Sequence, residues 1–275
     1  MMSIKTISVL GCGWYGLPLA KALLQQGFQV KGSTTSAQKL DVLADAGVIP
    51  YLLNISTEHQ QYESDFFDCD VLWISIPPKS RQGEAGAYLQ KIKSIIDIAK
   101  QHNVKQVVFI SSTGVYGDVN AELTELDVPM PDTDSGCALL EVETYLQQQT
   151  AFTTTILRFG GLLGPNREPG RFFAGKKAIP NGEAPVNLIH LADCIGVSQA
   201  IVAQHAFGKV YNACAPHHPT KAHFYAKAAT AIGLDTPEFI PELQQWKTVN
   251  SVHVKPVLGY TYQVNNWDKW LDSLF

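Results

Sequence analysis

Three glycines near the N-terminus constrain the fold of this chain more than any other feature. They follow an apolar run, residues 7–10, with the spacing Gly11-x-Gly13-x-x-Gly16. The run predicts a β-strand, and the apolar periodicity after it predicts a helix that ends near Gly27. In such a unit the first glycine allows a tight turn, the second lets the backbone approach a pyrophosphate, and the third lets the helix pack closely. The motif predicts dinucleotide binding; the alternative is a glycine-rich turn that binds nothing.

The second predicted strand, residues 28–32, leads into a loop rich in hydroxyl groups. An NAD-binding unit carries an acidic residue roughly 20 positions beyond the first glycine, where it holds the ribose. No carboxylate occurs here before Asp41. The hydroxyl and ammonium groups of this stretch belong to Ser33, Thr34, Thr35, Ser36, Lys31 and Lys39. They could accept a 2′-phosphate, which favours NADP over NAD, or the hydroxyls could cap the next helix.

Strands and helices alternate regularly up to about residue 160. Further strands are predicted at residues 48–54, 70–76, 105–111 and 153–159, and helices at 38–46 and 88–101. This alternation predicts an α/β fold, a Rossmann-type doubly wound parallel sheet. Beyond residue 160 the chain is rich in turns, which predicts a smaller substrate-side region. The expected domains are residues 1–160, binding NAD(P), and residues 161–275, partly returning to the first domain.

Ligands bind at the C-terminal edge of such a sheet, and the unusual loops all lie there. The candidate cofactor contacts are Gly11, Gly13, Trp14, Tyr15, Gly16, Ser33, Thr34, Thr35, Asn54, Ile76, Pro77 and Ser111. Asn54 is expected beside the adenine, although it could be a turn residue. The polar loop at 79–83 could close over a cofactor or be a solvated connection.

Composition excludes several other classes of function. The net charge of −4 provides no basic field for nucleic acid, and no apolar run is long enough to span a bilayer. The start of the sequence lacks the pattern of a secretory signal. Five cysteines are scattered without a CxxC motif, which predicts reduced thiols, a cytoplasmic location and no metal site.

Four stretches together resemble the extended short-chain dehydrogenase/reductase superfamily, the group of NAD-dependent epimerases and dehydratases. They are the Gly11–Gly16 turn, Ile110-Ser-Ser-Thr-Gly-Val-Tyr-Gly117, Ile156-Leu-Arg-Phe-Gly-Gly-Leu-Leu-Gly-Pro165 and Val186-Asn-Leu-Ile-His-Leu-Ala-Asp193. The spacing GxGxxG differs from the GxxGxxG of the extended group, and 275 residues is short for it. Both departures resemble the atypical members, which include a small bacterial subgroup.

The resemblance implies that Ser112 hydrogen-bonds a substrate oxygen. The alternative is that Ser111, Ser112 and Thr113 satisfy backbone groups in a tight turn. The Tyr-x-x-x-Lys pair that supplies the family's acid and base maps to Ser135 and Leu139, so the pair is lost. Ser135 is then expected to be a helix N-cap beside Asp134, and the active site is degenerate.

Thr113, Arg171 and His190 are the candidate substrate contacts. Arg171 lies in a basic loop with interleaved phenylalanines, which could hold an anionic or nucleotide-linked substrate or be a solvated loop. His190 lies in a stretch that lines the substrate side in the family, but a buried, hydrogen-bonded histidine is equally consistent.

Two functional hypotheses follow. The first is an oxidoreductase of the NAD(P)-dependent epimerase, dehydratase or reductase kind, acting on a small hydroxylated or nucleotide-linked compound. The second is a non-catalytic NAD(P)-binding or redox-sensing protein, which accounts for the missing acid/base pair. A homodimer is one expectation, because helices that flank such sheets often pair.

Overall fold

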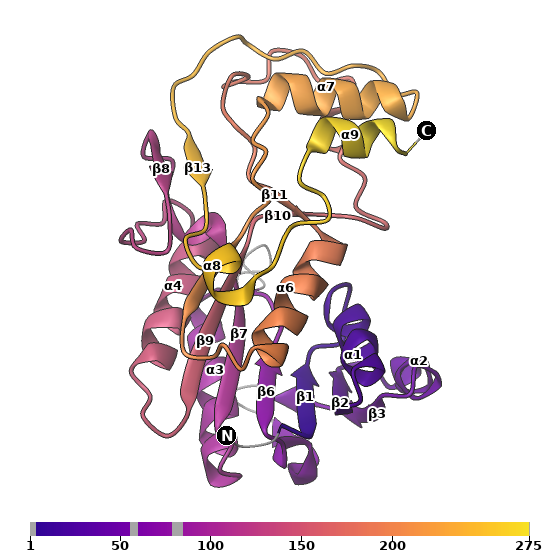
Figure 1. Ribbon diagram of the computed structural model, residues 1–275, viewed down its shortest axis with the longest axis vertical. Coiled ribbons are helices and arrows are strands. Elements are labelled where there is room, and N and C mark those ends of the chain that lie inside the picture. The colour runs from indigo at the N-terminus through magenta and orange to yellow at the C-terminus, as the bar shows by residue number, and fades with distance from the viewer. Residues whose placement is uncertain (1–3, 56–59, 79–84, 275) are drawn as a thin grey trace. The chain divides into compact units, whose positions relative to one another are not determined.

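The computed structural model describes residues 4–55, 60–78 and 85–274. Its largest sheet has seven strands in the order β12-β9-β7-β6-β1-β2-β3 (Figure 1). These strands are β1 (Thr6–Leu10), β2 (Gln29–Thr34), β3 (Ile49–Leu52), β6 (Val71–Ile74), β7 (Gln106–Ser112), β9 (Thr153–Phe159) and β12 (Val210–Ala213). β1 pairs in parallel with β2 and β6, and the pairs β2–β3 and β6–β7 are also parallel. The predicted Rossmann-type α/β fold is confirmed.

The first strand lies where the order of the sheet reverses. β2 and β3 follow on one side of β1, whereas β6 and β7 follow on the other. All four residues of β6 are buried, as expected of a strand that is covered on both faces of a parallel sheet. The C-terminal ends of β1, β2 and β6 therefore meet at the switch point, where open α/β sheets bind their ligands.

The described residues form these helices. They are α1 (Gly16–Gln25), α2 (Leu40–Asp45), α3 (Ala85–Gln101), α4 (Asp134–Gln147), α5 (Gly170–Phe173), α6 (Leu191–Ala203), α7 (Lys221–Ala231), α8 (Val254–Leu258) and α9 (Trp267–Asp272). Short 3₁₀ turns are η1 (Ala37–Lys39), η2 (Ser64–Phe67) and η4 (Thr113–Val115). Gly27 follows α1 with φ +89°, the left-handed conformation predicted for the end of this helix. Within the described ranges, no helix combines the length and the apolar character needed to cross a membrane.

Three two-stranded sheets complete the described elements. They are β4 (Asn54–Ile55) with β5 (Gln60–Gln61), β10 (Gly161–Leu163) with β11 (Leu188–His190), and β8 (Ala121–Leu123) with β13 (Lys247–Val249). The last two pairs are parallel and join segments far apart in the sequence. The polar loop predicted to close over a cofactor, residues 79–83, lies outside the described residues.

Contacts divide the chain into two compact units, and the chain enters each unit more than once. The first unit is Met1–Ser111, Thr133–Leu157 and Ser198–Tyr211, and the second is Ser112–Asp132, Arg158–Val197 and Asn212–Phe275. A domain boundary at residue 160 with a partial return of the chain stays a prediction.

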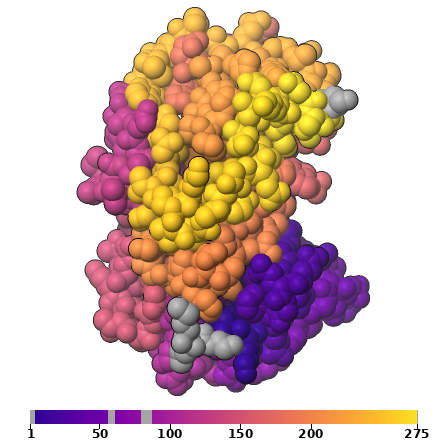
Figure 2. Space-filling model, in the orientation of Figure 1, coloured from indigo at the N-terminus to yellow at the C-terminus, as the bar shows by residue number. Residues whose placement is uncertain are grey.

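The second unit has its own apolar core around α7 and α9. Phe224 and Trp267 are fully buried in it, with their rings in edge-to-face contact at 6.1 Å. Figure 2 shows the yellow C-terminal residues of α9 beside the orange surface of α7. This aromatic packing fixes the last helix of the chain against α7.

Candidate cofactor site

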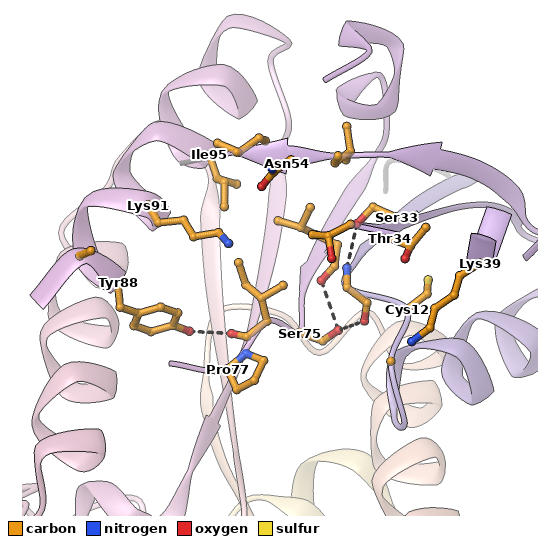
Figure 3. A pocket seen from close by; sticks show the side chains of 18 residues that line it. Cys12, Ser33, Thr34, Lys39, Asn54, Ser75, Pro77, Tyr88, Lys91 and Ile95 are labelled. Carbon is orange, nitrogen blue, oxygen red and sulfur yellow. Dashed lines mark hydrogen bonds between the residues drawn. The ribbon is translucent and has the colours of Figure 1, made fainter. Parts of the chain in front are cut away.

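The glycine turn after β1 is held from two sides by serine side chains. The backbone N–H of Gly11 donates to Ser33 Oγ at 2.9 Å, and Ser75 Oγ donates to the carbonyl oxygen of Gly11 at 2.7 Å (Figure 3). Ser33 belongs to β2, and Ser75 follows β6 directly. Gly11 has φ +99°, a conformation that side-chain-bearing residues rarely adopt. The turn therefore has a single, well-supported conformation.

The other two glycines of the motif have different tasks. A Cβ at Gly16 would lie 2.2 Å from the carbonyl oxygen of Gly11, so only glycine lets α1 begin this close to the turn. A Cβ at Gly13 would meet no atom within 4 Å, and Gly13 is exposed. The protein interior thus requires Gly16, whereas the space at Gly13 is left for a ligand to approach the backbone.

A cavity of about 570 Å³ opens beside this turn. It is bounded by the C-terminal ends of β1, β2, β3 and β6 and by one face of α3. Its volume is within the range of small-molecule and cofactor sites, about 300–1,000 Å³. The predicted cofactor contacts that line it are Gly11, Gly13, Ser33, Thr34, Thr35, Asn54, Ile76 and Pro77.

The remaining predicted contacts, Trp14, Tyr15, Gly16 and Ser111, are not among the lining residues. Tyr15 is buried, and its hydroxyl lies 2.6 Å from Ser198 Oγ, which gives it a packing role. Trp14 is half-buried. The Ser111 hydroxyl is buried at the end of β7 and has no hydrogen-bond partner among the described residues. A role for these residues toward a cofactor stays a prediction.

One face of α3 contributes residues that the sequence reasoning missed. Tyr88, Lys91 and Ile95 line the cavity and follow the i, i+3, i+7 spacing of a single helix face. The Tyr88 hydroxyl donates to the carbonyl oxygen of Ile76 at 2.8 Å, which ties α3 to the segment after β6. This spacing was visible in the sequence, but only the strand order places α3 beside the turn.

The charges around the cavity favour a phosphate-bearing ligand. Its described lining includes Lys39 and Lys91 and no carboxylate. Figure 3 shows the two ammonium groups approaching from opposite sides. The first turn of α1 contains no acidic residue, so nothing there offsets the positive end of the helix dipole. The open backbone at Gly13 and these cations fit a dinucleotide.

Two details near β2 correct the sequence interpretation. Lys31 is 8% exposed, and its ammonium group donates to the carbonyl oxygens of Asp65 and, at 2.9 Å, Asp68. It therefore does not line the cavity, and Lys39 alone of the two lysines remains for a 2′-phosphate. The Ser33 hydroxyl supports the glycine turn and caps no helix.

Cys12 also lines the cavity. Burial raises the pKa of its thiol to about 12, against a lowering by a backbone hydrogen bond with Ser33. The thiol is therefore neutral at physiological pH and adds no charge to the site.

Ser112 and Thr113 belong to the second unit. The Ser112 hydroxyl accepts a hydrogen bond from the backbone N–H of Gly114 at 3.0 Å and so caps η4, which is the backbone-satisfying alternative. Thr113 is 5% exposed. Tyr116 packs in the interior, where its hydroxyl donates to the carbonyl oxygen of Thr124 at 2.7 Å. Contact of Ser112 with a substrate oxygen stays a prediction.

Helix α4 carries no acid/base pair at the positions that the family motif indicates. Ser135 is half-buried in its first turn, and Leu139 is 7% exposed. The expectation that Ser135 caps this helix is wrong. Thr133 is the N-cap, because its hydroxyl accepts the backbone N–H of Gly136 at 3.2 Å.

The remaining predicted substrate contacts have local partners in the second unit. His190 Nδ1 accepts the backbone N–H of Ala192 at 3.2 Å, so the side chain caps α6. Burial lowers the pKa of His190, against a raising effect of Asp193. Arg171 Nε pairs with Glu168 at 2.6 Å on the surface. Their binding of a substrate stays a prediction.

Comparison with known proteins places the chain in a family. Residues 11–196 match the model of the NAD(P)H-binding family. The chain is 37% identical over 265 residues to Protein YeeZ of Escherichia coli (strain K12), covering 94% of this chain and 96% of that protein.

Two solved structures share the fold at lower identity. A short-chain dehydrogenase/reductase superfamily protein from Agrobacterium tumefaciens with bound NAD has a TM-score of 0.77 at 19% identity, covering 98% of this chain and 95% of that chain. UDP-N-acetylglucosamine 4-epimerase from Bacillus cereus has a TM-score of 0.77 at 16% identity, covering 99% of both chains.

Proposed function

We propose, from the premise that this chain belongs to the NAD(P)H-binding family, that it is an NADP-dependent oxidoreductase of the reductase, epimerase or dehydratase kind. Its substrate would be a small hydroxylated compound. The observation that carries the proposal is the cavity at the glycine turn, whose described lining has lysines and no carboxylate. A nicotinamide cofactor supplies a hydride donor or acceptor, and the chain supplies its binding and orientation.

The end of β2 would select the phosphorylated ribose. Thr34 and Thr35 present hydroxyls where an NAD-specific unit has a carboxylate, and Lys39 adds a positive charge from η1. A carboxylate there would repel a 2′-phosphate, whereas hydroxyl and ammonium groups donate hydrogen bonds to it. These three residues support NADP over NAD.

The rest of the cavity would hold the other parts of the cofactor. The backbone at Gly13 and the start of α1 would face the pyrophosphate. Asn54, at the start of β4, would contact the adenine, with Ile95 of α3 as an apolar wall. Ser112 would polarise a substrate oxygen, as the resemblance implies.

A second candidate function is a non-catalytic NADP-binding or redox-sensing protein. Ser135 and Leu139 favour it, because neither side chain can exchange a proton in the way of an activated tyrosine. The two candidates share the cofactor site and differ only in turnover.

Calorimetric titration of nucleotide-free protein with NADPH, NADH, NADP and NAD tests the proposal. We expect NADPH to bind about tenfold or more tightly than NADH, the equivalent of one charge-assisted hydrogen bond. No binding of any of the four would overturn the proposal. Binding without oxidation of NADPH by a panel of small aldehydes and ketones would favour the second candidate.

A further inference from the structure

A second cavity, of about 240 Å³, lies entirely within the second unit. It is lined by β13 and the residues just before it, by the start of α7, and by the segment that leads into β11. The lining residues that bear on its chemistry are Asp118, Asn187, Lys221, Tyr225, Trp246 and Lys247. None of the substrate contacts predicted from the sequence is among them.

Part of this lining is fixed by hydrogen bonds. Asn187 Nδ2 donates to the carbonyl oxygen of Lys247 at 2.8 Å, and Asn187 Oδ1 accepts the backbone N–H of Val249 at 2.7 Å. The Lys247 ammonium group pairs with Asp118 at 3.1 Å and also donates to the carbonyl oxygen of Tyr116. With its side chain 15% exposed, Lys247 is a half-buried cross-link between β13 and the segment at Asp118.

Lys221 differs from Lys247 in its bonding. Its backbone N–H donates to the carbonyl oxygen of Ala184 at 2.9 Å, which anchors the start of α7. Within the described ranges, neither its ammonium group nor the Tyr225 hydroxyl has a hydrogen-bond partner. The two residues are four positions apart on α7, so their side chains lie on the same helix face.

The charged residues that line this cavity leave one positive charge without a negative partner among those lining residues that the structure describes. Asp118 neutralises Lys247, whereas Lys221 has no carboxylate beside it among the described lining residues. Burial raises the pKa of Tyr225 to about 12, so its hydroxyl is a hydrogen-bond donor at physiological pH. Trp246 adds a flat, half-buried surface. The Lys221 ammonium group, the Tyr225 hydroxyl and the Trp246 ring together favour a ligand that has one negative charge and a flat apolar part.

We propose that this cavity binds a small organic monoanion, with its carboxylate held by Lys221 and Tyr225 and its apolar part against Trp246. The volume equals about eight water molecules at roughly 30 Å³ each, enough for about ten non-hydrogen atoms. It is less than half the volume of the cavity in the first unit, so a nucleotide-linked compound would not fit. The site goes beyond the proposed cofactor function and does not depend on it.

Benzoate and benzamide are matched probes for this site, because they share a ring and differ in charge. We expect calorimetric or ligand-observed NMR titration to show benzoate binding about tenfold more tightly than benzamide. Lys221→Met should lose about the same factor for benzoate and none for NADPH. Tyr225→Phe should lose a smaller factor. Lys255→Met, an exposed lysine of α8, is the matched control and should bind benzoate like the wild type.

Three results would overturn the proposal. They are equal affinity for benzoate and benzamide, wild-type benzoate affinity in Lys221→Met, and no benzoate binding by protein that still binds NADPH. The last result would leave the cofactor function standing. Conversely, charge-selective benzoate binding without nucleotide binding would support this site and overturn the cofactor function.

Discussion

The Ser33 hydroxyl accepts a hydrogen bond from the backbone N–H of Gly11 at 2.9 Å and thereby couples β2 to the turn after β1. Ser33 is 3% exposed, so water contributes little to this contact. Ser75 holds the carbonyl oxygen of the same glycine from the other side. Because the protein itself fixes the turn, a ligand that binds there would not have to order it.

Replacing Ser33 with alanine should weaken both the fold and the cofactor site. The change leaves the Gly11 N–H without its acceptor, which we expect to lower the free energy of unfolding by about 1–3 kcal/mol. NADPH affinity should fall with it. Urea unfolding and calorimetric titration measure the two effects. Ser36→Ala, which removes an exposed hydrogen bond from the Ser36 hydroxyl to the Gln38 side chain, should stay within about 0.5 kcal/mol of the wild type.

Alanine at Gly13 should lower the affinity for NADPH, whereas alanine at Gly16 should lower the thermal stability. Gly13→Ala should keep its stability, because the new Cβ meets no protein atom, and should lose NADPH affinity. Gly16→Ala should unfold at lower temperature, because its Cβ would lie 2.2 Å from the Gly11 carbonyl oxygen. Thermal unfolding with and without NADPH distinguishes the two. Unchanged NADPH affinity in folded Gly13→Ala would contradict an approach of the ligand to this backbone.

Lys39→Met should reduce affinity for NADPH by about tenfold and leave NADH affinity unchanged, because the lysine would contact only the 2′-phosphate. Lys91→Met is the comparison, since Lys91 approaches from the opposite side of the cavity. It should alter NADPH and NADH affinity by similar factors. Titration of both variants with both nucleotides checks this, and an equal loss for both nucleotides in Lys39→Met would contradict the assignment.

Reintroducing the family's acid/base pair should cost stability at one position only. Ser135→Tyr should be tolerated because Ser135 is half-buried, whereas Leu139→Lys places an ammonium group at a site that is 7% exposed. We expect the second change to lower the free energy of unfolding by about 3 kcal/mol. Leu139→Met, of similar volume, serves as the control. Urea unfolding of the three variants would refute this if Leu139→Lys were as stable as Leu139→Met.

The cap at His190 should make stability depend on pH. Burial lowers its pKa in the folded protein from 6.5, so the unfolded chain binds the proton more readily. The stabilisation is complete above pH 6.5 and is lost as the pH falls through the folded-state pKa. His190→Asn retains a capping oxygen without a titrating group, so its unfolding free energy should fall less steeply below pH 6.5. Urea unfolding at a series of pH values measures both slopes, and a wild-type slope in His190→Asn would refute the contribution of this histidine.

Much of the fold followed from periodicity. Glycine spacing, buried apolar runs and regular alternation predicted the parallel sheet and the end of the first helix at Gly27, because each reports a local preference. The cavity was predicted less completely. Tyr88 and Lys91 lie far along the chain from Gly11, and only the switch in strand order brings α3 beside it.

Side-chain bonding at the turn was the least predictable. Ser33 carries a hydroxyl and Lys31 an ammonium group, both of which could bind a 2′-phosphate. In the folded protein, however, Ser33 bonds the backbone N–H of Gly11 and Lys31 bonds the carbonyl oxygen of Asp68. Thr133 rather than Ser135 caps α4, because the helix begins two residues earlier than a cap at Ser135 would place it. Which of several neighbouring hydroxyls bonds a backbone N–H group depends on the local backbone geometry, which cannot be deduced from residue types alone.

The strand order also has a consequence for synthesis on the ribosome. The residues that line the cofactor cavity all precede β7, and the five adjacent strands from β7 to β3 are complete by Ser112. The strand that covers the open edge of β7 begins only at Thr153, and β12 comes later still. A nascent chain that has completed the cofactor cavity therefore still exposes the unpaired edge of β7. The risk of aggregation through this edge is greatest while the ribosome translates the residues between Ser112 and Thr153.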